Sequence, residues 1–156
     1  MKGFQEIIQE SVVCLNMAEK DGLDVIAQLV SQAVQQGVLK AEDEESVMHA
    51  IISREQSAPT AQPEGIAIPH GRISCISEVV FLLGLHPEGV DFGAPDGLPT
   101  RIFALMLAPQ SSGAGYIQFL AKLCQRLLKG SIREQLLSAT SKQSVCEALL
   151  QENRAL

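Results

Sequence analysis

Short apolar runs alternate with stretches of helical periodicity along the chain. Residues 11–17 form an apolar run between polar residues and predict a first strand. Over residues 21–36 apolar positions recur at intervals of three and four, which predicts an amphipathic helix ended by Gly37. Acidic residues open the segment 42–55, where a helix dipole favours negative charge, and predict a second helix. This part of the chain is therefore expected to contain one strand followed by two helices.

Dense apolar segments follow a polar loop in the middle of the chain. The loop, residues 56–65, contains two prolines and lacks strand alternation. Residues 79–85 and 102–108 are apolar enough to be central strands. Between them, glycines, prolines and the pair Asp96-Gly97 predict a hairpin or a series of tight turns.

Helical periodicity returns in the last third of the chain. A helix is expected from Tyr116 to a stop at Gly130, and further helices after N-caps at Ser131 and at Thr140 or Ser141. The residues expected on the buried face of the first helix are Ile117, Leu120, Ala121, Cys124, Leu127 and Leu128. Strands bracketed by helices predict an α/β fold, with a sheet covered by helices.

Length, charge and cysteine spacing narrow the possible classes of protein. The 156 residues predict a single domain over 1–156. A net charge of −6 opposes binding to nucleic acid or to an anionic membrane surface. No apolar stretch reaches the roughly 18 residues of a membrane helix, and the N-terminus lacks a signal peptide's apolar run, so a cytoplasmic protein is expected. The four cysteines lack zinc-ligand spacing, so we expect small buried thiols in a reducing compartment and no metal site.

His70 stands in the context that most favours chemistry. It follows the apolar residues 66–68 and Pro69 and precedes a glycine, which predicts a presented rather than a buried imidazole. A nucleophilic histidine needs one nitrogen with its lone pair accessible, and the other N–H held by a group such as the carbonyl at a strand end. If the electrophile is a phosphoryl group, cations must surround its oxygens. Arg54 and Arg72 are the candidates, although a surface charge is the simpler interpretation of Arg72.

The remaining motifs offer no competing chemistry. His49 lies inside a predicted helix and His86 precedes a proline, so both are interpreted as structural or solvent-exposed. The sequence contains no G-x-S-x-G, no G-x-x-x-x-G-K and no H-E-x-x-H motif, which leaves a hydrolase, a nucleotide-driven kinase and a zinc protease without support.

Several segments around His70 match one family pattern. Residues 65–70 read GIAIPH, the helix before them ends in Arg54-Glu55, and the segments VDFGAPDGLPTRIFALMLAP and GYIQFLAKLCQRLLK follow. Together they resemble the fructose–mannitol class of phosphotransferase-system enzyme IIA domains, which includes the nitrogen-regulatory IIA proteins. The resemblance covers essentially the whole chain. It implies an α/β sandwich with a mixed sheet flanked by helices, a cytoplasmic location, and no metal or organic cofactor.

The resemblance also implies roles for individual residues and partners. His70 accepts the phosphoryl group from a small histidine-containing phosphocarrier protein, and Arg54 pairs with the phosphoryl oxygens or orients the site. In sugar-uptake members the group passes to a cysteine of a IIB domain, whereas regulatory members act on other proteins. Because no IIB or membrane domain is attached here, a regulatory role is favoured over a sugar-specific one. Neither the sugar nor the regulated partner follows from the sequence.

Two departures from the family pattern leave a second hypothesis open. The family's second histidine is replaced by Tyr116, which can donate a hydrogen bond but cannot become a cation near neutral pH. Tyr116 is equally interpreted as the start of a helix that covers the edge of the core. In the loop after Arg54-Glu55 only Thr60 is retained. The alternative function is a non-catalytic interaction module with impaired phosphotransfer, so whether the chain takes part in catalysis is left open.

Overall fold

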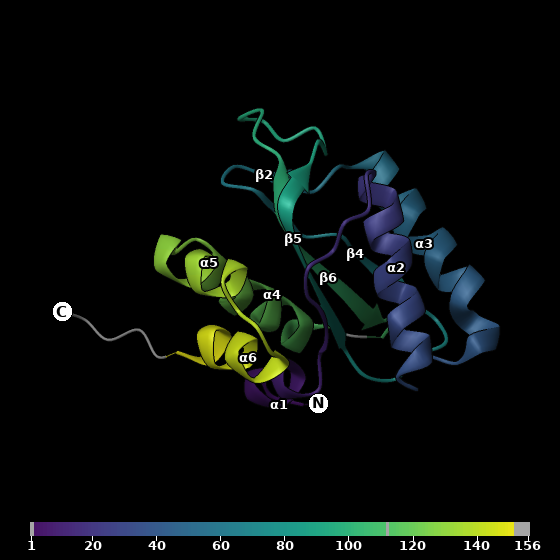
Figure 1. Ribbon diagram of the computed structural model, residues 1–156. Coiled ribbons are helices and arrows are strands. Elements are labelled where there is room, and N and C mark those ends of the chain that lie inside the picture. Colours follow the sequence, from purple (N-terminus) through teal and green to yellow (C-terminus); the bar gives the residue numbers. More distant parts are fainter. Residues whose placement is uncertain (1, 112, 152–156) are drawn as a thin grey trace.

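A central β-sheet separates two layers of helices (Figure 1). The computed structural model describes residues 2–111 and 113–151. One layer holds α2 (Gly22–Gln35) and α3 (Glu44–Ser57), which follows the short 3-10 turn η1 (Ala41–Asp43). The other layer holds α1 (Phe4–Gln9), α4 (Ala114–Leu127), α5 (Gly130–Leu137) and α6 (Lys142–Leu150). The expected sheet covered by helices is confirmed.

The sheet is mixed. Its strands are β1 (Val12–Cys14), β2 (Ala61–Gln62), β3 (Ile66–Ala67), β4 (His70–Ile73), β5 (Val80–Val90) and β6 (Thr100–Pro109). They follow the order β1-β5-β6-β3-β2, with β4 also paired to β6. β5 and β6 form the predicted antiparallel hairpin, whereas β1 runs parallel to β5, and β3 and β4 run parallel to β6. Pro69, which has no N–H, separates β3 from β4.

The two faces of β6 belong to two separate hydrophobic cores. Met106 and Ala108 pack in the core shared with α1, α4, α5 and α6. Phe103, Leu105 and Leu107 alternate with them and pack in the core shared with α2 and α3. Burial on both faces explains why this strand reads as a continuous apolar run. The alternation also shows which β4 side chains face α4, because β4 is in register with β6.

Several element boundaries differ from the sequence expectation. Helix α1 was not predicted, since six residues carry too little periodicity to be recognised; its buried Ile7 and Ile8 pack into the α4 core. Strand β2 lies inside the expected loop and pairs with β3. Helix α4 ends at Leu127, before the predicted stop at Gly130. Gly130 instead begins α5, so Ser131 is not an N-cap. Ser141 caps α6 as predicted, through a capping box with Ser144.

The predicted buried face of α4 is correct at Leu127 and is otherwise shifted by about one residue. The structure buries Tyr116, Phe119, Leu123 and Leu127. Ile117 and Leu128 are 61% and 75% exposed, Ala121 is exposed as well, and Leu120 and Cys124 are only half-buried. Two apolar stripes run along this helix about 100° apart, so the sequence alone favours neither. Packing against the sheet selects the stripe with the aromatic residues and leaves the other facing outward.

Candidate functional site

The hydrogen bonds of His70 define its protonation. Its Nδ1 lies 2.8 Å from the Ile68 carbonyl oxygen, and this oxygen can only accept. The proton therefore sits on Nδ1, and the lone pair sits on Nε2. Arg54 Nη2 lies 3.2 Å from that Nε2 and donates to it. The strand-end carbonyl that the sequence predicted is thus that of Ile68, and it leaves the lone pair of a neutral imidazole on Nε2.

Arg54 is held at the C-terminal end of α3 by the loop that follows it. Its Nη1 donates to the Ala58 carbonyl oxygen at 2.7 Å. Glu55, only 5% exposed, accepts from the backbone N–H and the hydroxyl of Thr60 at 2.6 and 2.5 Å. This buried carboxylate fixes the loop that carries Ala58, and so the direction of the guanidinium. The sequence analysis matched Glu55 and Thr60 to the family pattern but gave them no role. The hydrogen bonds between them depend on the path of the loop after α3, which the sequence pattern does not show.

Tyr116 and Arg72 meet beside this pair. Tyr116 begins the buried face of α4 and is 7% exposed. The Arg72 guanidinium lies over its ring, 5.4 Å from the centroid. Burial raises the pKa of Tyr116 above its ordinary 10.0, while the positive charges of Arg72 and Arg54 act in the opposite direction. Tyr116 therefore covers the edge of the core, as one of its two interpretations expected, and lies close to both arginines.

A groove of about 680 Å³ begins at His70 and Arg54 and runs along α4. Ile66, Ile68, Leu120 and Leu128 give it apolar walls, and Arg133 lies among the lining residues; Tyr116 does not. Half-exposed His70 is therefore reachable from one side. An apolar surface around an imidazole lone pair and the guanidinium groups of Arg54 and Arg133 suits an anionic group carried by another macromolecule.

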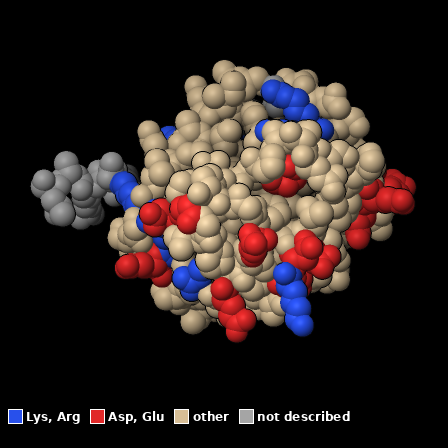
Figure 2. Space-filling model, turned by 90° about the horizontal axis from the view of Figure 1, so that it is seen from above, with Lys and Arg blue, Asp and Glu red and all other residues tan. Residues whose placement is uncertain are grey.

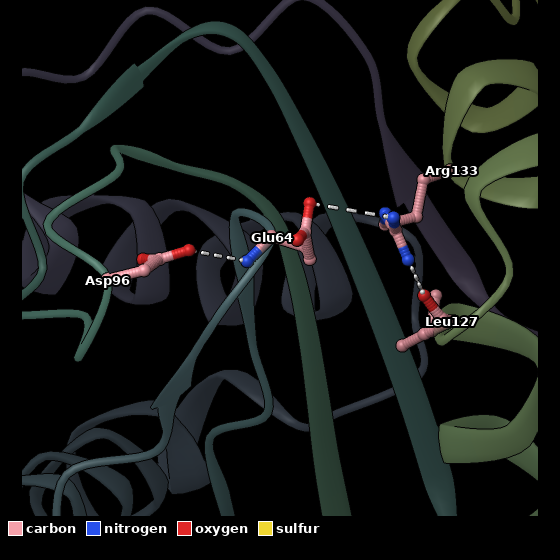
Figure 3. Close-up of polar contacts among 4 residues, drawn as sticks. All are labelled: Glu64, Asp96, Leu127 and Arg133. Atoms are coloured by element: carbon pink, nitrogen blue, oxygen red, sulfur yellow. Dashed lines mark hydrogen bonds and ion pairs between the residues drawn. The ribbon is translucent and has the colours of Figure 1, made fainter.

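Three chain segments are tied together at Glu64 (Figure 3). The backbone N–H of Glu64 donates to Asp96 Oδ2 at 2.9 Å, and its carboxylate lies 3.7 Å from Arg133. Arg133 also donates to the Leu127 carbonyl at 2.9 Å. These contacts connect the β5–β6 hairpin, the turn between β2 and β3, and the junction of α4 with α5. They fix the wall of the groove that Glu64 and Arg133 line.

Comparison with known proteins shows the family to which the chain belongs. Residues 6–152 match the family described as phosphoenolpyruvate-dependent sugar phosphotransferase system, EIIA 2. The chain belongs to this family. The resemblance expected from GIAIPH and the segments around it is confirmed.

Relatives of this EIIA 2 chain fall into sugar-specific and regulatory groups. It is 33% identical to the PTS system fructose-specific EIIA component of Haloferax volcanii, over 85% of this chain and 83% of that one. It is 29% identical to a nitrogen regulatory protein of Bradyrhizobium diazoefficiens, over 76% and 80%. It also matches the fructose-specific EIIABC component of Bacillus subtilis at 28% identity, with 96% of this chain covering 23% of that protein.

Solved structures confirm the fold. Nitrogen regulatory protein IIA-Ntr from Neisseria meningitidis superposes with a TM-score of 0.81 at 25% identity, over 93% of this chain and 97% of that one. The complex of enzyme IIAMTL with phosphorylated enzyme IIBMTL from Escherichia coli contains a similar chain, with a TM-score of 0.71 at 26% identity, covering 88% and 92%.

The other histidines of this EIIA 2 chain differ from His70. His86 is buried, its Nε2 lies 2.7 Å from the Glu19 carbonyl oxygen, and its Nδ1 accepts from the Gly89 N–H at 2.8 Å. Both of its ring nitrogens are therefore occupied, which confirms the structural interpretation. His49 is exposed on α3.

The cysteines are less buried than expected. Cys75 is exposed, and Cys14, Cys124 and Cys146 are only partly buried. Cys14 and Cys146 pack at the margin of a core rather than inside it, and Cys124 lines the groove along α4. All four are free thiols, and burial raises the pKa of Cys14 to about 11. Within residues 2–111 and 113–151, no cluster of His, Cys, Asp or Glu could hold a metal ion, and no helix is long and apolar enough to cross a membrane.

Charged side chains are interspersed on the face seen from above the hairpin (Figure 2). Acidic groups lie between the basic ones rather than apart from them. On this face the arrangement differs from the continuous basic surface that binds phosphate backbones.

Asp96 makes the tie at Glu64 dependent on pH. The N–H groups of Glu64 and Leu98 lower the pKa of Asp96 below its ordinary 3.8. Its contribution to stability is therefore complete above that value and is lost as the pH falls through the lowered pKa of the folded state. We expect Asp96→Asn, which keeps an acceptor, to lower the urea midpoint at about pH 6 but not at about pH 2. An equal difference at both pH values would contradict this.

Proposed function

We propose that this chain is a phosphoryl carrier that accepts the phosphoryl group on His70 Nε2 from a histidine-containing phosphocarrier protein. The single observation that carries the proposal is the neutral imidazole of His70. Its N–H is fixed on the Ile68 carbonyl, and its lone pair faces Arg54 at the edge of an open groove. Membership of the EIIA 2 family supports the reaction class.

The transfer requires few groups from the protein. The Nε2 lone pair attacks phosphorus, a new N–P bond forms, and the P–N bond of the donor breaks with its electron pair returning to the donor imidazole. The His70 ring gains positive charge, which the Nδ1–H bond to Ile68 stabilises. Arg54 exchanges its bond to Nε2 for a phosphoryl oxygen while its second nitrogen stays on Ala58. The transfer is accelerated by the alignment of the two imidazoles with the phosphorus atom and by the positive charge of Arg54 near the phosphoryl oxygens.

The outward stripe of α4 is the surface on which the phosphocarrier docks in this proposal. Ile117 and Leu128 are exposed, and Leu120 joins them at the edge of the groove. Exposed apolar side chains that continue a groove lined by the nucleophile are typical of a protein-binding surface. The donor would thus cover the reacting atoms and exclude water while the group is transferred.

The onward acceptor belongs to one of two classes. A IIB domain fits the fructose-specific relatives and the solved IIA–IIB complex, and a regulated protein fits the nitrogen regulatory relatives. The non-catalytic interaction module is not favoured, because the lone pair of His70 stays directed to the open groove although Tyr116 replaces the second histidine.

Intact-protein mass spectrometry tests the proposal. The chain is incubated with phosphoenolpyruvate, enzyme I and the phosphocarrier protein, and the adduct is then mapped by fragmentation. A single acid-labile phosphoryl group on the peptide that contains His70 is the expected result. If a known IIA domain is labelled in the same mixture and this folded chain is not, the carrier function is wrong.

A further inference from the structure

The register of β4 places Arg72 on the same face as His70. His70 is paired with Met106 and Arg72 with Ala108, and both partners pack in the core on the α4 side. Alternation along a strand therefore directs both side chains toward α4, about 6.5 Å apart at the backbone. Gly71, between them, faces Ile51 of α3 on the other side. Arg72 thus flanks the nucleophile from its own strand.

The aromatic ring of Tyr116 supports the Arg72 guanidinium. The group lies over that ring, and its Nη1 is 3.4 Å from the Gln110 carbonyl oxygen. Tyr116 is only 7% exposed, so its ring is held in place by packing and is not a mobile surface group. The positive charges of Arg72 and Arg54 both act to lower the pKa of its phenol, so both cations lie within electrostatic range of Tyr116.

A phosphoryl group on His70 presents three acceptor oxygens, more than Arg54 contacts while one of its nitrogens stays on Ala58. At neutral pH such a group carries a charge of about −1.5 to −2, and Arg54 carries one positive charge and keeps one nitrogen on Ala58. Arg133, the other arginine lining the groove, already faces the Glu64 carboxylate. Arg72 is the cation that the strand register brings beside His70.

We propose that Arg72 is a second phosphoryl-binding residue and that Tyr116 is the positioning residue that holds it. In the phosphorylated chain Arg54 and Arg72 contact different phosphoryl oxygens, with the N–P bond between them. Tyr116 acts through its ring and contributes little through its hydroxyl. The inference rests on the proposed function, since it concerns the same His70.

The test compares Arg72→Gln and Arg72→Lys with the unchanged chain, using phosphoenolpyruvate, enzyme I and the phosphocarrier protein. We expect Arg72→Gln to lower kcat about tenfold, less than for a fully buried donor because Arg72 is partly in water. Arg72→Lys should restore part of the rate, since it keeps the charge but not the planar fork. The matched control is Arg101→Gln, which removes one arginine from the far end of β6 and should leave kcat unchanged.

A second readout follows the phosphoryl group itself. In a ³¹P NMR titration of the phosphorylated chain, loss of Arg72 should raise the pKa of the phosphoryl group, because its dianion loses a counter-charge. Tyr116→Phe should behave like the unchanged chain, whereas Tyr116→Leu should reproduce the Arg72→Gln effect and add nothing to it in the double variant. Circular dichroism establishes that each variant is folded.

The outcomes separate the two proposals. If the unchanged chain takes up the phosphoryl group and Arg72→Gln alters only KM, Arg72 contacts the donor protein and the inference is overturned while the carrier function stands. An unaltered ³¹P titration would overturn it as well. If the unchanged chain takes up no phosphoryl group, both proposals are wrong.

Discussion

The His70→Gln variant is expected to take up no phosphoryl group, the largest effect that any single substitution should have on this chain. Glutamine is polar and similar in size to histidine, and its amide occupies the place of Nε2, so the side chain still fills its position although the Nδ1 bond to the Ile68 carbonyl is lost. It offers no nitrogen lone pair comparable with that of a neutral imidazole, and the N–P bond therefore has no site at which to form. The measurement is the phosphoryl adduct by intact mass, with the thermal unfolding midpoint recorded to establish that folding is unchanged.

His49→Gln is the matched control for this variant. His49 is exposed on α3, so the same substitution there should leave both the adduct and the unfolding midpoint as they were. His86 is unsuitable, because its buried imidazole bonds to Glu19 and Gly89 and its loss would destabilise the chain. Persistence of an acid-labile adduct on the His70→Gln chain would place the acceptor elsewhere and refute the assignment.

The second large effect is expected at Arg54. Arg54→Gln should lower kcat for phosphoryl uptake by about 10²–10³, the range for removing one preorganised donor from developing charge. Arg54 joins the Ala58 carbonyl to the Nε2 of His70, and a lysine cannot make both bonds with the same fixed geometry. Arg54→Lys should therefore recover only part of the rate. Quenched uptake assays over a range of donor concentrations separate kcat from KM.

Two results would count against this role. A fall in kcat for Arg101→Gln, which carries the same charge change away from His70, would show that net charge rather than position matters. An Arg54→Gln chain that transfers at the normal rate would show that Arg54 only braces the loop after α3. In that case Glu55, which fixes the same loop through Thr60, would remain the residue on which its path depends.

The sequence predicted the main helices and strands well because their patterns are long. The periodicity over residues 21–36 and the apolar runs around β5 and β6 carry enough repeats to define an element and its burial. The short elements, α1 and β2, were missed because six and two residues contain almost no pattern. Their existence depends on neighbours: α1 packs on the α4 core, and β2 pairs with β3.

In the candidate site, too, some features follow from local sequence and others depend on tertiary contacts. A histidine after a strand and a proline is a local signal, and GIAIPH together with Arg54-Glu55 indicated the family. The contact between Arg54 and His70 joins residues sixteen positions apart and depends on how α3 meets the edge of the sheet. The outward stripe of α4 is likewise a tertiary result, since two apolar faces competed and the aromatic one was buried.

By itself, the sequence determined which elements form, which family they belong to, and that His70 is the residue to examine, because propensity, periodicity and short motifs act over a few neighbouring positions. Only the tertiary structure decided which nitrogen of His70 carries the lone pair, how Arg54 is oriented, and that the Arg72 guanidinium lies over the ring of Tyr116. The reason is physical: hydrogen-bond direction and strand register depend on groups brought together by packing.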